Sequence, residues 1–332
     1  MSRGKFSLLV VPILVLFALQ FSLPLLSQTA IHEAQPRPEA AGPLELSSAT
    51  AADLQKAMNV HDYVRAEKLL LAEIDRDPHS PRTGRLLAYI GSVYFISHDY
   101  LNAAVAWKKA QSITPLNTKL RFSLAMAYIR LARPDWARSE LRDLARENVN
   151  DALYPYWLGR LDYDEHFYSQ AIGNFRQAIE LDPRMARAFD NLALCYFYEN
   201  QNGLAVQNFK RAIELDRESG HPSPWPYLNL GITEQFLNQA VEAEKDLREA
   251  LRLDPGFAKA HFQLGTVLED KGESESALAE LKEAARLDPT FPEPHMAMAR
   301  LYHKLGQEKA AREEVKIYLG LRPPSNPPTA KE

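Results

Sequence analysis

The stretch of sequence that decides the fold runs from Leu253 to Pro289 and reads LDPGFAKAHFQLGTVLEDKGESESALAELKEAARLDP. It begins and ends with the same tripeptide, so that Pro255 and Pro289 lie 34 residues apart. Between them, apolar residues recur at intervals of three and four, which is typical of helices and not of strands. A proline disfavours helical angles in the residue before it, so each Leu-Asp-Pro ends a helix. We therefore expect a unit of two helices that is closed by its proline.

The same period continues through most of the chain. Leu-Asp-Pro recurs at residues 181–183, and weaker copies end at Pro78, Pro115 and Pro323. Two insertions interrupt the period, at Pro81–Thr83 and at Gly220–Ser223. When each proline is set at place 32 of a 34-residue unit, eight units follow, starting at residues 47, 84, 118, 152, 186, 224, 258 and 292. These units fill residues 47–325, so that residues 31–46 are expected to be a disordered linker and residues 326–332 a disordered tail.

Small residues recur inside the units at fixed places. Seven of the units carry glycine or alanine at the eighth place, where the first unit has Leu54. All eight carry alanine at the twentieth place, from Ala66 in the first unit to Ala311 in the last. Small side chains let two helix axes approach closely. The two helices of each unit should therefore pack tightly against each other.

These residues resemble the tetratricopeptide repeat (TPR) pattern W-x₂-L-G-x₂-Y…A-x₃-F…P. The unit at 84–117 matches it through Ile90-Gly91, Tyr94, Ala103, Trp107 and Pro115. The resemblance implies an all-α fold, a right-handed α-solenoid (superhelix) of about eight TPR helix-turn-helix units, in which the first helices line a concave groove. It also implies a scaffold that binds a protein or peptide partner in that groove and is not itself an enzyme. The first unit, 47–80, departs most from the pattern because of Leu54, as a terminal cap does.

The N-terminus carries a targeting pattern. Arg3 and Lys5 precede an apolar run over residues 6–26, which is typical of a secretory signal and almost long enough to span a membrane. We expect residues 1–30 to act as a signal peptide or a signal-anchor of a bacterial exported protein. The sequence is compatible with cleavage and with retention. The protein would then be periplasmic or secreted, or be attached to the inner membrane through residues 6–26.

The resemblance places several side chains in the groove. Amides in register could hydrogen-bond the backbone of an extended peptide, although asparagine is also common at this place of the repeat; they are Asn191, Asn229 and Gln263. Basic residues at the second and ninth places could pair with acidic groups of a partner, or could be solvated helix ends; they are Arg85, Lys119, Arg187, Lys259, Arg160 and Arg300. Acidic residues share the same face, which makes the groove mixed in charge; they are Asp164, Asp190, Glu269 and Asp270. Aromatic residues could anchor a partner or pack between units; they are Phe95, Tyr156, Tyr163, Phe197, Tyr198 and Phe236.

The composition and the absence of known motifs argue against catalysis and against nucleic-acid binding. The chain has 332 residues with 39 basic and 43 acidic side chains, a net charge of −4, and so lacks the basic excess of a nucleic-acid binder. The single cysteine, Cys195, excludes an internal disulfide framework and a thiolate-rich metal site. We find no phosphate-binding loop, nucleophile elbow or zinc-protease motif in the sequence. We therefore expect no catalytic residues, no metal and no cofactor.

Two classes of function remain open. The first is a non-catalytic scaffold outside the cytoplasmic membrane. The second is a substrate-recruiting subunit of a multi-chain envelope enzyme, such as a glycosyltransferase, or of polysaccharide export. The last unit ends in an apolar helix at residues 308–321, which also permits self-association.

Overall fold

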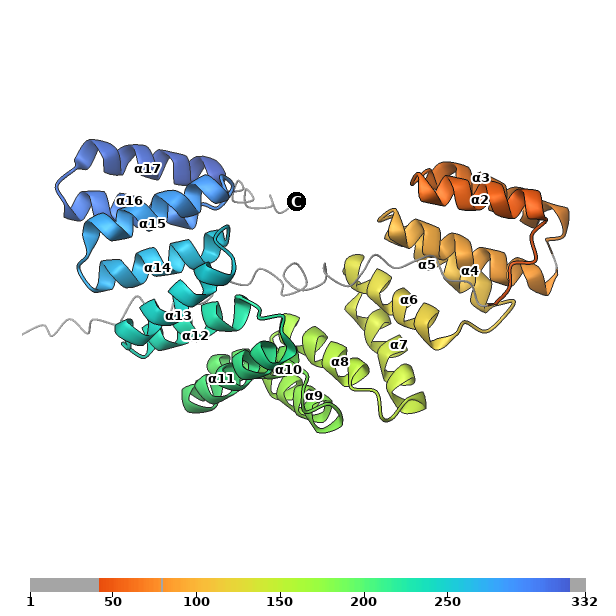
Figure 1. The fold of residues 1–332 in the computed structure, drawn as a ribbon, viewed down its shortest axis with the longest axis horizontal. Helices are drawn as coiled ribbons and strands as arrows, with labels where there is room; N and C mark the ends of the chain where they lie inside the picture. Colours follow the sequence, from red (N-terminus) through yellow and green to blue (C-terminus); the bar gives the residue numbers. More distant parts are fainter. Residues whose placement is uncertain (1–41, 79, 323–332) are drawn as a thin grey trace, which may run out of the picture. The chain divides into compact units, whose positions relative to one another are not determined.

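The computed structural model describes residues 42–78 and 80–322. These residues form sixteen α-helices and no strand, as expected for an all-α repeat fold. Figure 1 labels the helices from α2 to α17. Their bounds are α2 Ser48–Asn59, α3 Tyr63–Arg76, α4 Pro81–Ile96, α5 Tyr100–Gln111, α6 Thr118–Arg130, α7 Pro134–Glu147, α8 Leu153–Asp164, α9 Tyr168–Leu181, α10 Ala186–Tyr198, α11 Asn202–Ser219, α12 Trp225–Phe236, α13 Ala240–Leu253, α14 Ala258–Asp270, α15 Ser274–Leu287, α16 Glu293–Lys304 and α17 Glu308–Leu321.

The chain divides into two compact units, which we describe separately. The first contains residues up to Asn150 together with Arg160–His166, and the second contains Asp151–Gly159 and the residues from Phe167 onward. Apart from α8, which is divided between the units, the even-numbered helices pack against the odd-numbered helix that follows, as in α4 with α5 and α14 with α15. Each pair also contacts the next pair along the chain within its unit.

The turn inside every helix pair contains one residue with a left-handed backbone. These residues occupy the fifteenth place of each sequence unit, and their φ angles lie between 53° and 80°; they are His61, His98, Ala132, His166, Asn200, Asn238, Gly272 and Gly306. Glycine and asparagine adopt this conformation at low cost, whereas Ala132 pays a steric penalty. The three histidines therefore have a place in the turn and do not converge on one site.

Glycines at the eighth place allow the close approach of paired helices. A Cβ atom at Gly91 would lie 2.5 Å from the indole ring of Trp107, and one at Gly159 would lie 2.8 Å from the ring of Phe175. The Trp107 indole N–H donates a hydrogen bond of 2.9 Å to the carbonyl of Ala88. The large residue on the second helix thus fills the space that the missing side chain leaves on the first.

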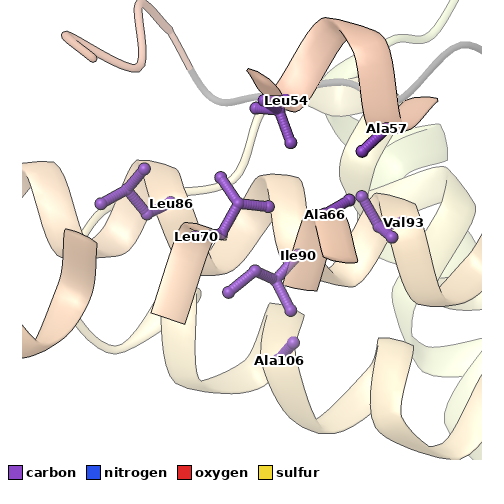
Figure 2. Packing of buried hydrophobic residues seen from close by; sticks show 8 residues of the cluster. All are labelled: Leu54, Ala57, Ala66, Leu70, Leu86, Ile90, Val93 and Ala106. Carbon is purple, nitrogen blue, oxygen red and sulfur yellow. The ribbon is translucent and has the colours of Figure 1, made fainter. Parts of the chain in front are cut away.

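The first helix pair is packed into the protein despite its weak match to the repeat. Leu54 and Ala57 of α2 and Ala66 and Leu70 of α3 meet Leu86, Ile90 and Val93 of α4 and Ala106 of α5 in one buried cluster (Figure 2). Leu54 is therefore a core residue, although it replaces the small side chain expected at its place.

Residues at the end of the expected linker are ordered against this cluster. Leu44 and Leu46 pack on it, and the backbone carbonyl of Leu44 accepts a hydrogen bond of 3.1 Å from Arg82. Glu45 forms an ion pair of 2.7 Å with Arg85. The expectation of a disordered linker is therefore wrong for residues 44–46, because two leucines there find apolar surface to cover.

Both insertions lie at helix ends. Pro81 is in the first turn of α4, so Pro81–Thr83 lengthen that helix to 16 residues. Helix α11 continues to Ser219 and has 18 residues, and Gly220 then ends it with a φ of 77°. The second insertion therefore follows a second helix that, with 18 residues, is longer than the 14-residue helices α9 and α13.

Several expectations lie outside the described residues. These are the targeting segment 1–30, the greater part of the linker and the tail 326–332. Within residues 42–78 and 80–322, we find no helix with the length and apolar character that a membrane span requires.

Candidate functional site

The first helices of the second unit form one continuous face. Helix α10 contacts α12, α12 contacts α14, and α14 contacts α16. The residues that the sequence assigns to the groove can therefore be followed from helix to helix along this face. They fall into an aromatic group and a polar group.

Four aromatic rings join three helices at one end of this face. Tyr198 of α10 stacks on Tyr168 of α9, with ring centroids 4.8 Å apart and planes 5° from parallel. Phe197 meets the Tyr198 ring edge-on at 5.7 Å and the Phe236 ring of α12 at 5.4 Å. We call Tyr168, Phe197, Tyr198 and Phe236 the aromatic surface.

The aromatic surface is partly open to solvent. The side chain of Phe236 is 53% exposed, and the other three residues are half-buried. Burial, followed by the neighbouring Tyr198, raises the pKa of Tyr168 to about 12, so its phenol is neutral at physiological pH. The surface is thus uncharged, broad and held rigid by contacts among its own rings.

One of the three amides predicted to form a hydrogen-bonding ladder in the groove lies in the core instead. Asn191 is only 1% exposed, and its amide nitrogen donates to the carbonyl of Arg187 at 2.7 Å and to the Tyr156 hydroxyl at 3.4 Å. Asn229 donates to Asp190 of the preceding first helix at 3.0 Å. These amides are used inside the protein, and the ladder prediction is wrong at Asn191 because the side chain turns inward.

Gln263 belongs to a second polar group. Its amide donates to Gln235 of α12, and Gln235 in turn donates to Asp270 at 2.5 Å. Next to them, Arg300 of α16 forms a two-pronged contact with Glu269 of α14, at 3.0 and 2.6 Å. These contacts tie α12, α14 and α16 together, so the polar part of the face is largely self-satisfied.

Two other basic residues, Arg187 and Lys259, lie over aromatic rings of their own unit. The Arg187 guanidinium lies 4.8 Å from the centre of the Tyr156 ring. The Lys259 ammonium lies 5.3 Å from the Trp225 ring, and burial lowers its pKa. Arg160 is buried, and Lys119 is exposed. The sequence correctly predicted that these residues lie on first helices. Their binding of an acidic partner stays a prediction.

The remaining predicted aromatic residues are separate from the aromatic surface. Tyr156 is buried against Trp157 and Phe175 in the core of the second unit. Phe95 packs on Tyr100 and Trp107 in the first unit, where Tyr163 also lies, half-buried. Tyr156 is therefore a packing residue, and the prediction that it lines an open groove is wrong.

Two members of this face were missed by the sequence analysis. Tyr168 begins a second helix, at place 17, and only first-helix places were considered. Gln235 occupies the twelfth place, where only aromatic side chains were taken as candidates. Ring-to-ring spacing between places 13 and 17 of adjacent units is the signal that could have revealed Tyr168.

The described residues show no arrangement suited to a metal ion, since no group of three histidine, cysteine or acidic side chains converges in them. Cys195 is buried within α10.

Known proteins share this fold. A family model described as a tetratricopeptide repeat matches residues 156–220, and one described as a TPR repeat matches residues 268–306. No curated protein matches the chain.

Solved structures extend the likeness over most of the chain. A tetratricopeptide repeat protein from Parabacteroides merdae ATCC 43184 has a TM-score of 0.60 at 17% identity, over 82% of this chain and 98% of its own. Yeast Tom70 has a TM-score of 0.57 at 17% identity, over 86% of this chain and 63% of its own. Pseudomonas aeruginosa pilF has a TM-score of 0.55 at 17% identity, over 63% and 93% of the two chains. The two matched segments and the shared fold together identify tetratricopeptide repeats in this chain.

Proposed function

We propose that the protein is a non-catalytic scaffold that binds a protein or peptide partner, and that the aromatic surface anchors this partner. Tetratricopeptide repeat proteins generally mediate protein–protein interactions, which supports the class of function. The exposure of Phe236 within a rigid group of rings is the observation that carries the choice of site.

Aromatic rings on this face are better anchors for a partner than its amide side chains. Aromatic side chains at the centre of an interface supply most of its binding energy because they bury a large area at little conformational cost. The amides and the Arg300–Glu269 pair already have internal partners, so a ligand would have to break those contacts before using them. Recognition should therefore depend on apolar or aromatic side chains of the partner.

A peptide selection tests this proposal. We would select peptides from a displayed library on the purified protein and then measure Kd for the wild type and for Phe236→Ala. Loss of a central aromatic contact costs about 2 kcal/mol, so Kd should rise about thirtyfold. Leu319→Ala is the matched control, because Leu319 is also a large apolar residue, 61% exposed, but lies in α17.

The proposal fails if the selection yields no binder, if Phe236→Ala binds the selected peptides as the wild type does, or if Leu319→Ala weakens binding as much as Phe236→Ala. Far-UV circular dichroism of both variants must match the wild type, so that lost binding cannot be ascribed to lost helix.

We further propose that the protein acts outside the cytoplasmic membrane. The support is the sequence of residues 1–30, with Arg3 and Lys5 before an apolar run. Intact-mass measurement of the protein recovered from a bacterial host tests for removal of this segment, and fractionation locates the protein. Recovery of the full-length chain in the cytoplasm alone would refute the proposal.

A further inference from the structure

A cleft separate from the aromatic surface opens between α11, α12 and α13 of the second unit. Its volume is about 340 Å³. Helix α12 contributes Tyr227 and Glu234, and α13 contributes Asp246. Glu234 and Phe236 are two residues apart on one helix, so they point to nearly opposite sides of it, about 200° apart. A ligand in the cleft would therefore not contact the aromatic surface.

The other helix pairs show what the cleft lacks. In three pairs a basic residue at the fourth place of the first helix meets a carboxylate 19 residues later on the second helix. The contacts are Arg121–Glu140 at 3.4 Å, His261–Glu280 at 2.6 Å and His295–Glu314 at 2.7 Å. At the same two places α12 and α13 carry Tyr227 and Asp246. Asp246 thus keeps the carboxylate of this pattern without its basic partner.

Glu234 is a second departure at the same point. It occupies the eleventh place of its unit, where the unit of α8 carries Asp162. Asp162 forms an ion pair with Arg138. Arg138 is the fifth residue of the preceding second helix, α7. The corresponding residue of α11 is Val206. Both acids of the cleft therefore lack the cation that their counterparts have in other helix pairs.

The polar atoms in the floor of the cleft are buried and unsatisfied. Glu234 is 3% exposed, and its Oε2 atom has no hydrogen-bond partner among the described residues. The hydroxyl of Tyr227 is likewise buried without a partner. Leaving such groups unpaired costs free energy, and a donor that entered the cleft would recover it.

Charged groups also surround the cleft, and the three cations among them, Lys210, Arg217 and Lys245, favour the ionised form of Asp246. The charged groups come from α11 and α13 and are Lys210, Arg217, Glu242, Lys245 and Glu249. Burial, followed by the neighbouring Asp246, raises the pKa of Glu234 to about 7, and Lys210 only partly opposes this rise. Burial also raises the pKa of Asp246. Burial and the neighbouring Asp246 therefore favour a proton on the Glu234 carboxyl group.

We propose that the cleft binds one organic cation, a guanidinium or alkylammonium group, between Glu234 and Asp246. The bound group takes the role that the Arg121 guanidinium and the His261 and His295 rings play in the other pairs. Its five or three N–H donors satisfy the Glu234 carboxylate and the Tyr227 hydroxyl together. The cation can come from a free amine or from an arginine or lysine side chain of a partner.

Isothermal titration calorimetry of the full-length protein with N-acetylarginine amide tests this proposal. N-acetylcitrulline amide is the matched neutral ligand, because it has nearly the same shape and no charge. We expect saturable binding of the arginine compound at pH 8 and at least tenfold weaker binding of the citrulline compound. An arginine within an eight-residue glycine-serine peptide distinguishes the sources: binding equal to that of the free compound supports a partner's side chain, and exclusion of the peptide supports a small amine.

The pH dependence gives a second readout. The cation favours the ionised carboxyl, so binding below pH 7 must displace a proton. Affinity should therefore rise between pH 6 and pH 8, and titration in two buffers of different ionisation enthalpy should report proton release.

Two variants test the site and two serve as controls. Glu234→Gln should weaken binding at least tenfold, and Tyr227→His should abolish it by supplying the missing basic group from within. Glu280→Gln is the control, because Glu280 is the equivalent of Asp246 in a pair that already has its histidine. Phe236→Ala should leave binding unchanged, so the fate of this proposal is independent of the aromatic surface. Equal binding of the citrulline compound, no binding by pH 8, or full binding by a folded Tyr227→His variant would overturn the proposal.

Discussion

Adding a single methyl group should stabilise the protein at Gly173 and should be neutral or destabilising at Gly159. Both glycines lie inside helices of the same pair, α8 and α9. Replacing an interior helical glycine by alanine favours the helix by about 1 kcal/mol. A Cβ at Gly173 meets no atom within 4 Å, so Gly173→Ala should gain this free energy in full.

At Gly159 the same gain is opposed by overlap. The added Cβ would lie 2.8 Å from Cε1 and 2.9 Å from Cδ1 of Phe175. The Phe175 ring is fully buried and packs on Tyr156, so it cannot move aside without disturbing the core. Overpacking costs about 1–3 kcal/mol. Because the helical gain is common to both variants, Gly159→Ala should be less stable than Gly173→Ala by this amount.

Urea unfolding followed by circular dichroism measures the difference. The comparison of midpoints is valid where the slopes of the two transitions agree, since a changed slope indicates a changed unfolded or native state. Equal midpoints, or a higher midpoint for Gly159→Ala, would refute the view that the eighth-place glycines are set by helix contact.

Two further predictions concern titrating groups. The hydrogen bond that the His261 ring donates to the Glu280 carboxylate raises the pKa of His261 above its ordinary value of 6.5, with burial opposing the rise. A raised histidine pKa stabilises the folded state fully below pH 6.5, and this contribution is lost as the pH rises through the folded pKa. The difference in unfolding free energy between wild type and His261→Gln should therefore be larger at pH 5.5 than at pH 9; a difference independent of pH would contradict the pairing. Glu234→Leu should stabilise the protein by about 1–2 kcal/mol at pH 8, since the next unit carries the buried Leu268 at the same place. An acid whose folded pKa is raised from 4.5 to about 7 destabilises the folded state increasingly between those two values. The gain should therefore shrink at pH 4.5, and unfolding titrations at both pH values check this; an unchanged gain would refute it.

The sequence predicted the helices well because their limits are local. A proline at place 32 and a small residue at place 8 act within one turn or one helix contact, so counting from Pro255 finds α14 and α15 without any knowledge of the rest. The left-handed turns are equally local, since Gly272 and Asn238 occupy the places where positive φ is needed.

The destinations of polar side chains could not be predicted in this way. A place in the repeat fixes the face of the helix on which a residue lies, but the partner of the side chain depends on the neighbouring helix. Asn191 belongs to a first-helix place and yet turns toward Arg187 and Tyr156. Leu44 and Leu46 likewise looked like linker residues, because the apolar surface they cover is formed by α2 and α4.

A repeat protein carries its own reference, and this changes how an odd residue is interpreted. Three helix pairs carry a basic residue at the place of Tyr227, and one carries an acid paired with arginine at the place of Glu234; both places face one cleft. Each departure alone removes a stabilising contact, and together they leave two carboxyl groups without the basic partners found at the equivalent places of other pairs. A basic residue at position 227 or at position 206 would restore one of these contacts and stabilise the folded protein. The proposed organic cation would add positive charge at the point where these two carboxyl groups meet.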